Sequence, residues 1–418
     1  MSSIRVGDEQ LAKAAKRLRD QPLDHGRWLE LAAMHHLRGE AEDSETVFAT
    51  LGEGARIGGQ VALAVACGRH LVELGSLRGG ELLDQVIETF ATGGPHFAFT
   101  APPAPADPPA VDPGTGPALE QARATVAQLG AWLTSRQVAA VPPAPLLSAL
   151  TKPGARALVG VMTARAFPAG SVIIEIGQPA TALYWLAHGT VSVARPRVTE
   201  TRAPASEPAG EFNELGELHS GAFFGEIALV GGTKRTARVT ARDDVWVLEI
   251  PARAVETAAT KHPKLAEVLA HHARARLLAN LTRTSELFRA LGESDREALL
   301  TKFETQLVAP GTTFIRENTA NQHLWVVVSG KCQVQSAGSA IAELGPGAAV
   351  GEISLVSGAQ AVANVVAVEP AVLLRLSRAD FEAVAKKHPA LLAEVERLVV
   401  ARETANRALF QDASDLIV

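Results

Sequence analysis

The 418-residue chain has little cysteine and no long hydrophobic run. Its two cysteines, Cys67 and Cys332, lie far apart in the sequence, so a disulfide framework is excluded and a reducing compartment is indicated. The longest apolar run, near Val61 to Cys67, is far shorter than the roughly 20 residues that a membrane-spanning helix needs. No secretory signal is visible at the N-terminus. These absences predict a cytoplasmic protein without a membrane contact.

Patterns that would indicate an enzyme are also missing. The sequence shows no P-loop, nucleophile elbow, kinase signature or metal-ligand spacing. The adjacent pairs His35-His36 and His271-His272 would point in different directions on a helix, which is poor geometry for one metal ion. We interpret these histidines as surface or hydrogen-bonded core residues. We therefore expect no catalytic residues, no metal and no cofactor.

An excess of positive charge is absent as well. The chain has 40 Lys and Arg against 45 Asp and Glu, a net charge of −5, which argues against a dedicated nucleic-acid-binding protein. Arg274, Arg276 and Arg283 form a modest basic face with His271 and His272, which we interpret as solvated or facing a protein partner. The length predicts about three domains.

One glycine-rich stretch, residues 224–241, predicts a binding site for a small anion that also carries hydroxyls. Its sequence is FGEIALVGGTKRTARVTA. A short helix after a glycine turn presents unpaired N–H groups, and Arg235 offers a planar fork of donors that can bind two phosphate oxygens. Glu226 can only accept when ionised, which suits a sugar hydroxyl. Taken alone, Glu226 and Arg235 would more simply form a surface ion pair.

The complete order of residues resembles the phosphate-binding cassette of cyclic-nucleotide-binding domains. That family includes the regulatory subunit of cAMP-dependent protein kinase and the sensor domain of the catabolite activator. The resemblance implies a cyclic nucleotide as ligand. The implied binding residues are Gly225, Glu226, Ile227, Ala228, Arg235, Thr236 and Ala237.

The resemblance leaves the base of the nucleotide open. A hydroxyl residue at the position of Thr236 can help to accept guanine, yet some members with threonine there prefer the adenine nucleotide. Thr236 is also an ordinary β-branched strand residue. We lean to cAMP and keep cGMP as the alternative.

The chain contains an internal duplication, which fixes the organisation of its C-terminal two thirds. Residues 145–150 and 167–171 recur 141 positions later, at 286–291 and 308–312. The cassette recurs only 126 positions later, so the first copy holds 15 additional residues. The Pro- and Ala-rich segment from Arg195 to Gly210 is predicted to be that insertion, an exposed loop.

Each copy has helical flanks around many short strands, which predicts a jelly-roll barrel with appended helices. We predict cyclic-nucleotide-binding domain A at 145–284 and a similar domain B at 285–418. The second cassette is degenerate: Gly351 and Glu352 are kept, but Ala361 stands where Arg235 stands in the first. Without the arginine, domain B should bind cyclic nucleotide poorly or not at all. Its predicted role is packing, dimerisation or partner contact.

The region before the duplication has helical patterning. In residues 1–95, Trp28, Gly39 and Phe48 follow an order that resembles a tetratricopeptide repeat, with a plain helical bundle as the alternative. Residues 96–118 read as a Pro- and Ala-rich linker, and residues 119–137 as an amphipathic connecting helix. The predicted fold class is multidomain α+β: a helical module followed by two β jelly-roll barrels.

These features predict a cytoplasmic cyclic-nucleotide receptor. Its first barrel would bind the ligand and signal to a protein partner through the helices, with a homodimer as one possible assembly. The alternatives are the regulatory subunit of a cyclic-nucleotide-dependent kinase and a scaffold that has lost ligand binding. The segment 100–143 lacks an Arg-Arg-x-Ser/Ala pseudosubstrate, which disfavours the kinase subunit. Arg235 disfavours the scaffold, and the absence of a helix-turn-helix pattern after the second barrel disfavours a transcription regulator.

Overall fold

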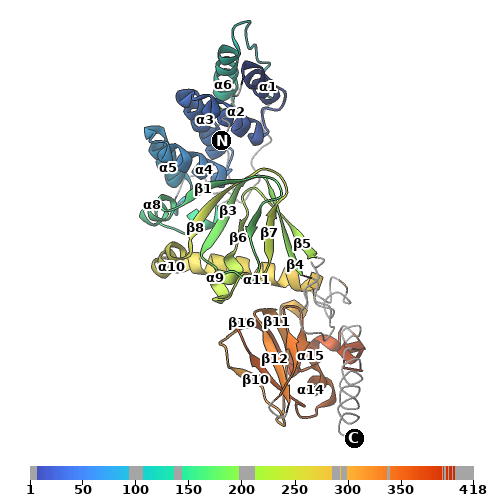
Figure 1. Cartoon of the computed structure of the whole chain (residues 1–418). Coiled ribbons are helices and arrows are strands. Elements are labelled where there is room, and N and C mark those ends of the chain that lie inside the picture. The colour runs from blue at the N-terminus through green and yellow to red at the C-terminus, as the bar shows by residue number, and fades with distance from the viewer. Residues whose placement is uncertain are drawn as a thin grey trace.

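The structure is a computed structural model, and it describes residues 7–93, 107–135, 144–196, 212–284, 292, 299–336, 339–387, 389, 392–393, 395–397 and 399–400. A helical region at the N-terminus lies against a first β-rich domain, and a second β-rich domain lies on the far side of the first (Figure 1). None of the helices among these residues combines the length and apolar character needed to cross a bilayer.

The N-terminal region consists of antiparallel helices, as its periodicity predicted. They are α1 (Asp8–Asp20), α2 (His25–Arg38), α3 (Ala41–Ile57), α4 (Val61–Glu73) and α5 (Leu77–Phe90). Local sequence sets several of the ends. The Asp24 carboxylate accepts from the N–H of Gly26 at the start of α2, and Gly39 ends that helix with a φ of 79°.

The predicted connecting helix is α6 (Ala118–Ser135), and it packs against α1 and α3. Small residues allow α6 and α3 to approach closely. A Cβ on Gly130 would lie 2.7 Å from Cγ2 of Thr50, and one on Gly54 would lie 2.2 Å from Cδ2 of Leu133. Of the predicted pair Trp132-Leu133, Leu133 is buried and Trp132 is half-buried. The remaining residues of the predicted linker, 96–106, lie outside the described part.

The first β-rich domain follows α7 (Pro145–Ser148) and α8 (Lys152–Gly160). Its strands form two four-stranded antiparallel sheets, in the orders β1-β8-β3-β6 and β2-β7-β4-β5. The strands are β1 (Thr163–Phe167), β2 (Val172–Ile174), β3 (Ala182–His188), β4 (Thr190–Pro196), β5 (Phe212–His219), β6 (Phe223–Phe224), β7 (Arg238–Ala241) and β8 (Val245–Pro251). Gly189 makes the predicted tight turn between β3 and β4 with a φ of 89°.

The second β-rich domain repeats this arrangement. Its sheets have the orders β9-β16-β11-β14 and β10-β15-β12-β13, which match those of the first domain strand for strand. The strands are β9 (Glu304–Val308), β10 (Thr313–Ile315), β11 (His323–Ser329), β12 (Cys332–Ser336), β13 (Ser339–Leu344), β14 (Ala349–Val350), β15 (Asn364–Ala367) and β16 (Ala371–Ser377). The duplication read from the sequence is thus a duplication of topology.

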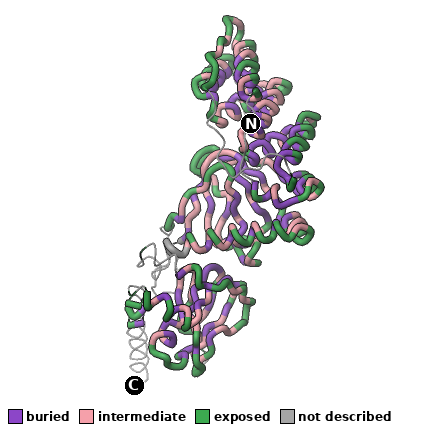
Figure 2. Tube along the Cα trace, turned by 180° about the vertical axis from the view of Figure 1, so that it is seen from behind, coloured by how far each residue is buried: buried purple, intermediate pink, exposed green. Residues whose placement is uncertain are grey.

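The helical region and the first β-rich domain share one hydrophobic core. The first eight residues of α4, 61–68, are apolar and buried, and the helix packs against α3, α5, β1, β3 and β8. At the junction the rings of Phe48, His70 and Trp246 lie with centroids 4.5 to 5.7 Å apart. Buried residues lie on both sides of this junction (Figure 2).

Two helices close the first β-rich domain, α10 (Ala252–Lys261) and α11 (Pro263–Thr284). Helix α11 also reaches the second domain. Arg274 donates to the main-chain oxygen of Phe303 at 2.8 Å and to Oγ1 of Thr305 at 2.6 Å. Leu277 belongs to a buried cluster made mostly of second-domain residues, against which Ile227 also packs.

Candidate functional site

The first cassette forms a tight turn followed by a short helix. Strand β6 leads into Gly225, which has a φ of 89°, and α9 (Glu226–Gly231) starts at the next residue. A Cβ on Gly225 would lie 2.5 Å from Nη1 of Arg235. Glycine is therefore required at this position both by its positive φ and by the close approach of the arginine.

The guanidinium of Arg235 ties this turn to a neighbouring strand. Nη1 donates to the main-chain oxygen of Gly225 at 3.0 Å, and Nη2 donates to that of Ala182 at 2.5 Å. The side chain is 6% exposed and lies 5.9 Å from the centroid of the Tyr184 ring. Burial lowers the pKa of Arg235 from its usual value, although an arginine remains charged at any physiological pH.

Glu226 is almost fully buried and pairs with an arginine from a distant part of the chain. Its exposure is 1%, and Nη1 of Arg276 on α11 lies 3.2 and 3.3 Å from its two carboxylate oxygens. Burial raises the pKa of Glu226, and Arg276 opposes that shift. The expectation that Arg276 belongs to a solvated or partner-facing basic face is therefore wrong, because the helix turns this side chain into the cassette.

The predicted binding residues line one cavity of about 230 Å³. Those on its wall are Gly225, Glu226, Ile227, Ala228, Arg235, Thr236 and Ala237. Sequence reasoning missed the other lining residues, which are Ile174, Val193, residues 215–218, Phe224 and Val239 on or beside the strands and Arg276, Ala279 and Asn280 on α11. The three α11 residues recur at helical spacing, a signal that could have indicated one common face.

The second cassette keeps the backbone shape without the arginine. Gly351 has a φ of 87° and precedes α14 (Glu352–Ser357), and Glu352 is buried as Glu226 is. Asn321 supplies hydrogen bonds like those of Arg235 in the first cassette. Its Nδ2 donates to the main-chain oxygens of His323 at 2.7 Å and of Gly351 at 3.3 Å. By the repeat offsets, these two carbonyls correspond to those that Arg235 binds in the first domain.

Apolar side chains surround the position of the missing arginine. Ala361 is buried in a cluster with Ile315 and Trp325, and Phe314 packs against the same cluster. The rings of Phe314 and Trp325 lie 5.2 Å apart. By the same offsets, Trp325 stands where the first domain has Tyr184. A phosphate at this position would meet the hydrocarbon of these described residues in place of the Arg235 guanidinium.

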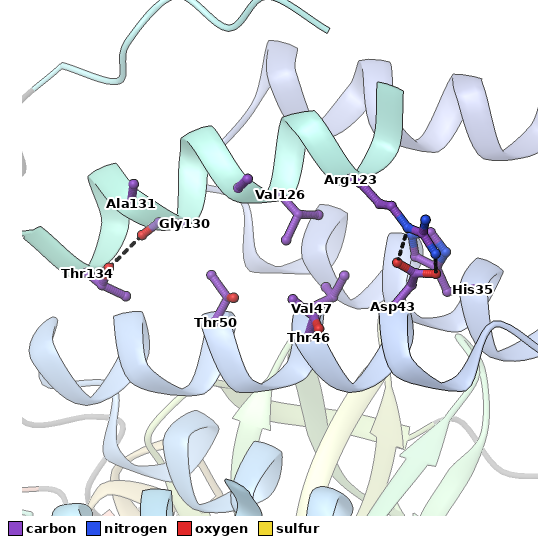
Figure 3. A pocket seen from close by; sticks show the side chains of 11 residues that line it. His35, Asp43, Thr46, Val47, Thr50, Arg123, Val126, Gly130, Ala131 and Thr134 are labelled. Carbon is purple, nitrogen blue, oxygen red and sulfur yellow. Dashed lines mark hydrogen bonds and ion pairs between the residues drawn. The ribbon is translucent and has the colours of Figure 1, made fainter. Parts of the chain in front are cut away.

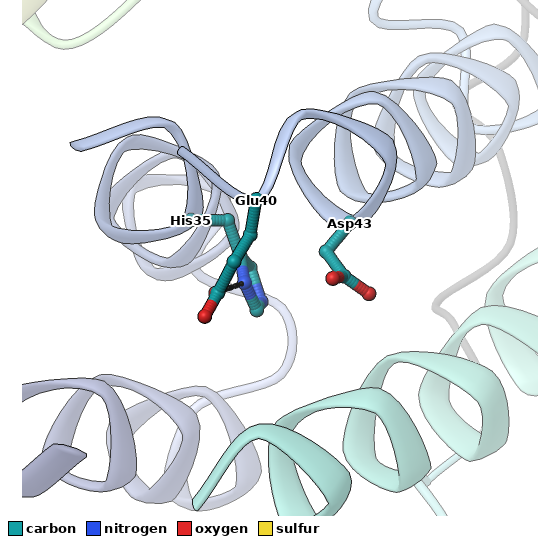
Figure 4. Close-up of side chains that lie close together, drawn as sticks. All are labelled: His35, Glu40 and Asp43. Carbon is teal, nitrogen blue, oxygen red and sulfur yellow. Dashed lines mark hydrogen bonds and ion pairs between the residues drawn. The ribbon is translucent and has the colours of Figure 1, made fainter. Parts of the chain in front are cut away.

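A second cavity, of about 200 Å³, lies between α3 and α6 (Figure 3). Beside it, ligand-type atoms of His35, Glu40 and Asp43 lie within 4.8 Å of one another (Figure 4). The carboxylates are already engaged: Arg123 donates to Asp43 at 2.6 and 2.9 Å, and Nδ1 of His35 lies 2.7 Å from Glu40. Nε of Arg38 also donates to Glu40 at 2.8 Å. A cation would have to displace these partners, so we interpret the group as a network that fastens α2, α3 and α6.

Comparison with known proteins assigns both β-rich domains. Residues 164–262 and 305–388 match the family described as cyclic nucleotide-binding domain. These two segments belong to that family, and the chain carries them in tandem.

Among the relatives, a cyclic nucleotide-gated potassium channel of Mesorhizobium japonicum, mll3241, is 33% identical over 111 residues, which cover 27% of this chain and 26% of the channel. A cAMP-dependent protein kinase regulatory subunit of Hypocrea atroviridis is 23% identical over 54% of this chain and 47% of its own length. A solved structure described as cAMP-bound PfPKA-R covers 63% of this chain and 85% of that chain, with 17% identity and a TM-score of 0.31. The chain spans between 26% and 37% of the first three curated relatives.

Proposed function

We propose that this protein is a cyclic-nucleotide receptor whose first domain binds cAMP or cGMP. The supporting observation is that Arg235 and Glu226, the cation for a phosphate and the acceptor for a ribose hydroxyl, face one cavity. An ionised Glu226 can only accept hydrogen bonds, so it suits a ribose hydroxyl and would repel a phosphate. The cyclic phosphate would therefore pair with Arg235. The cavity walls on β4, β5 and α11 would then surround the base.

In this proposal α11 carries the signal. Arg276 currently satisfies the carboxylate of Glu226, so a ribose hydroxyl that approaches Glu226 must share or replace this contact. The same helix holds the second domain through Arg274 and Leu277. A ligand that binds one position of α11 more tightly than another would shift the second domain through it.

The second domain, in this proposal, binds no cyclic nucleotide and serves as the body that α11 moves. Asn321 and the apolar cluster around Ala361 support that assignment. We propose no catalytic activity for the described residues. We further propose that each pair of sheets closes as a jelly-roll barrel and that α1–α5 form a tetratricopeptide-like module that binds a protein partner.

Calorimetric titration of cAMP and cGMP into the full chain and into Arg235→Ala tests the function. We expect binding with a stoichiometry of one that the substitution abolishes, because the phosphate loses its guanidinium. Far-UV circular dichroism and thermal unfolding of the variant exclude loss of fold as the cause. If a folded wild-type chain binds neither nucleotide, the receptor proposal is wrong and the scaffold alternative gains support.

A further inference from the structure

Strand β4 ends in an arginine that is buried inside the first domain. Arg195 is 6% exposed, and its Nε donates to the main-chain oxygen of Thr236 at 2.6 Å. Its Nη2 atom is buried, and among the described residues no acceptor lies within hydrogen-bonding distance of it. The sequence-based assignment of Arg195 to an exposed loop is therefore wrong; the other residues of that segment, except Pro196, lie outside the described part.

A buried guanidinium with an unused donor is energetically unfavourable. Folding removes its hydration, and the lost hydrogen bond is not replaced. Burial lowers the pKa of Arg195 to about 10, with no described carboxylate close enough to oppose the shift. Buried polar groups without a partner are rare in native proteins, and each requires an explanation, such as a water, an ion or a functional role.

The strand register places Arg195 on the side of the nucleotide cavity. Val193 lies opposite Val239 on β7, and both residues line that cavity. Side chains alternate along a strand, so Arg195 projects to the same side as Val193. The residues beside it on the β7 side, Thr236 and Ala237, also line the cavity. Arg195 does not itself line the cavity, but it lies beside Thr236 and Ala237, which do, at the end of the cassette.

We propose that Arg195 donates to the base of the bound nucleotide and gives the first site a preference for guanine over adenine. This inference rests on the proposed function. Arg235 and Glu226 already account for the phosphate and the ribose, so the base is the remaining source of acceptors. Guanine presents O6 and N7 side by side, which an arginine can bind together, whereas adenine presents N7 beside an amino donor. This proposal favours cGMP, whereas the sequence analysis leans to cAMP.

The test compares three ligands by calorimetric titration into the full chain: cGMP, cAMP and the cyclic inosine nucleotide. The inosine nucleotide keeps O6 and N7 but lacks the 2-amino group of guanine, so it isolates the edge assigned to Arg195. Arg195→Met should weaken cGMP and the inosine nucleotide by about 5- to 150-fold, the range of one good base contact. Its effect on cAMP should stay within about threefold.

Arg238→Met is the matched control. Arg238 lies on the neighbouring strand, but its guanidinium pairs with Glu175 at 2.8 Å. It stands between Ala237 and Val239, which line the cavity, so by strand alternation it projects to the opposite side of β7. Its substitution should leave the ratio of cGMP to cAMP affinity unchanged. If Arg195→Met fails to fold, Arg195→Gln serves instead, because an amide presents a donor beside an acceptor and no longer matches the two acceptors of guanine, so the same loss of preference for cGMP is expected.

Two results would overturn the role of Arg195 while leaving the receptor intact. Equal weakening of all three ligands would show that Arg195 holds the phosphate or the fold of the site. Unchanged affinities in a folded variant would show that it does not contact the ligand. Absence of binding in the wild-type chain is a different result, because it removes the proposed function itself.

Discussion

Arg235 has a structural task in the first cassette besides the phosphate contact that we propose for it. Its guanidinium bonds the carbonyls of Gly225 and Ala182, so it shapes the turn that would receive the ligand. The same turn also requires a residue without a side chain at position 225. The two residues therefore form one unit, and a change in either should alter both the shape of the site and its affinity.

Gly225→Ala should abolish nucleotide binding, and Gly221→Ala should not. Gly221 has nearly the same φ, 92°, but a Cβ there meets nothing within 4 Å, whereas a Cβ on Gly225 meets Arg235. Both variants should lose about 1–2 kcal/mol of stability from the left-handed backbone. Thermal unfolding and titration with cAMP and cGMP measure the two effects. Equal nucleotide affinities in the two variants would contradict the proposed dependence on Arg235.

At the scale of elements, α11 and α9 meet through the pair of Arg276 and Glu226. Arg276→Met leaves a buried carboxylate without its guanidinium and should raise the pKa of Glu226 further. We expect the free energy of unfolding to fall by about 1–3 kcal/mol at pH 7, a discounted figure because Arg276 is partly exposed. Urea unfolding of variant and wild type measures this difference.

The loss should depend on pH. A carboxyl whose pKa is raised in the folded state contributes stability that is fully present below its unfolded pKa, about 4.5, and is lost as pH rises through the raised value. The destabilisation by Arg276→Met should therefore shrink as pH is lowered toward 4.5. Glu226→Gln in the Arg276→Met background removes the titrating group and should flatten the profile. If Arg276→Met lowers the free energy of unfolding by the same amount at every pH, the assignment to Glu226 is wrong.

The second cassette allows a test of which residues prevent nucleotide binding there. Ala361→Arg alone should not create a nucleotide site, because Asn321 occupies the two carbonyls and Trp325 occupies the space. It should instead destabilise the second domain, since an unpaired guanidinium enters an apolar cluster. Titration should still give a stoichiometry of one.

The matched variant adds the residues of the first domain at the corresponding positions. Ala361→Arg with Asn321→Ala and Trp325→Tyr restores the free carbonyls and the smaller ring. We expect this triple variant to be more stable than Ala361→Arg alone. A second binding event in the single variant would show that Asn321 and Trp325 do not close the site.

At the scale of the whole molecule, the helical region and the first β-rich domain should unfold together. Phe48 is 7% exposed and contacts both His70 and Trp246 across the junction. Phe48→Ala should cost about 3–5 kcal/mol and move the unfolding of helices and sheet by the same amount. Far-UV circular dichroism and tryptophan fluorescence, recorded in urea, measure this.

Phe381→Ala is the control for that prediction. Phe381 is equally buried, at 3% exposure, but it lies in α15 (Arg378–Ala385) of the second domain. Its substitution should leave the transition of the first body in place. Separate transitions for α1–α5 and the first sheets in Phe48→Ala would contradict a shared core.

The sequence predicted what depends on local pattern and on repetition. Glycine turns, the cassette and the two copies follow from residues near one another, and the strand orders agree with the duplication. It did not predict the pairing of Glu226 with Arg276, 50 positions away, because only tertiary packing selects that arginine from its neighbours. The apolar run at 61–67 is too short to span a membrane, and its lack of a polar face indicates burial on all sides. This part of α4 is buried in that way.

Adjacent residues of helix α11 contact the two β-rich domains. Arg276 faces the first site and Leu277 the cluster of the second domain, and successive residues on a helix differ by 100° in direction. An insertion of one residue before Arg274 would rotate every later side chain by that angle, so Arg276 would take the direction that Leu277 has now and leave the first site. Seven inserted residues would nearly restore the direction but shift the later side chains by about 10 Å along the axis. Descendants of this chain that keep both contacts can therefore change α11 by substitution, while its length stays fixed.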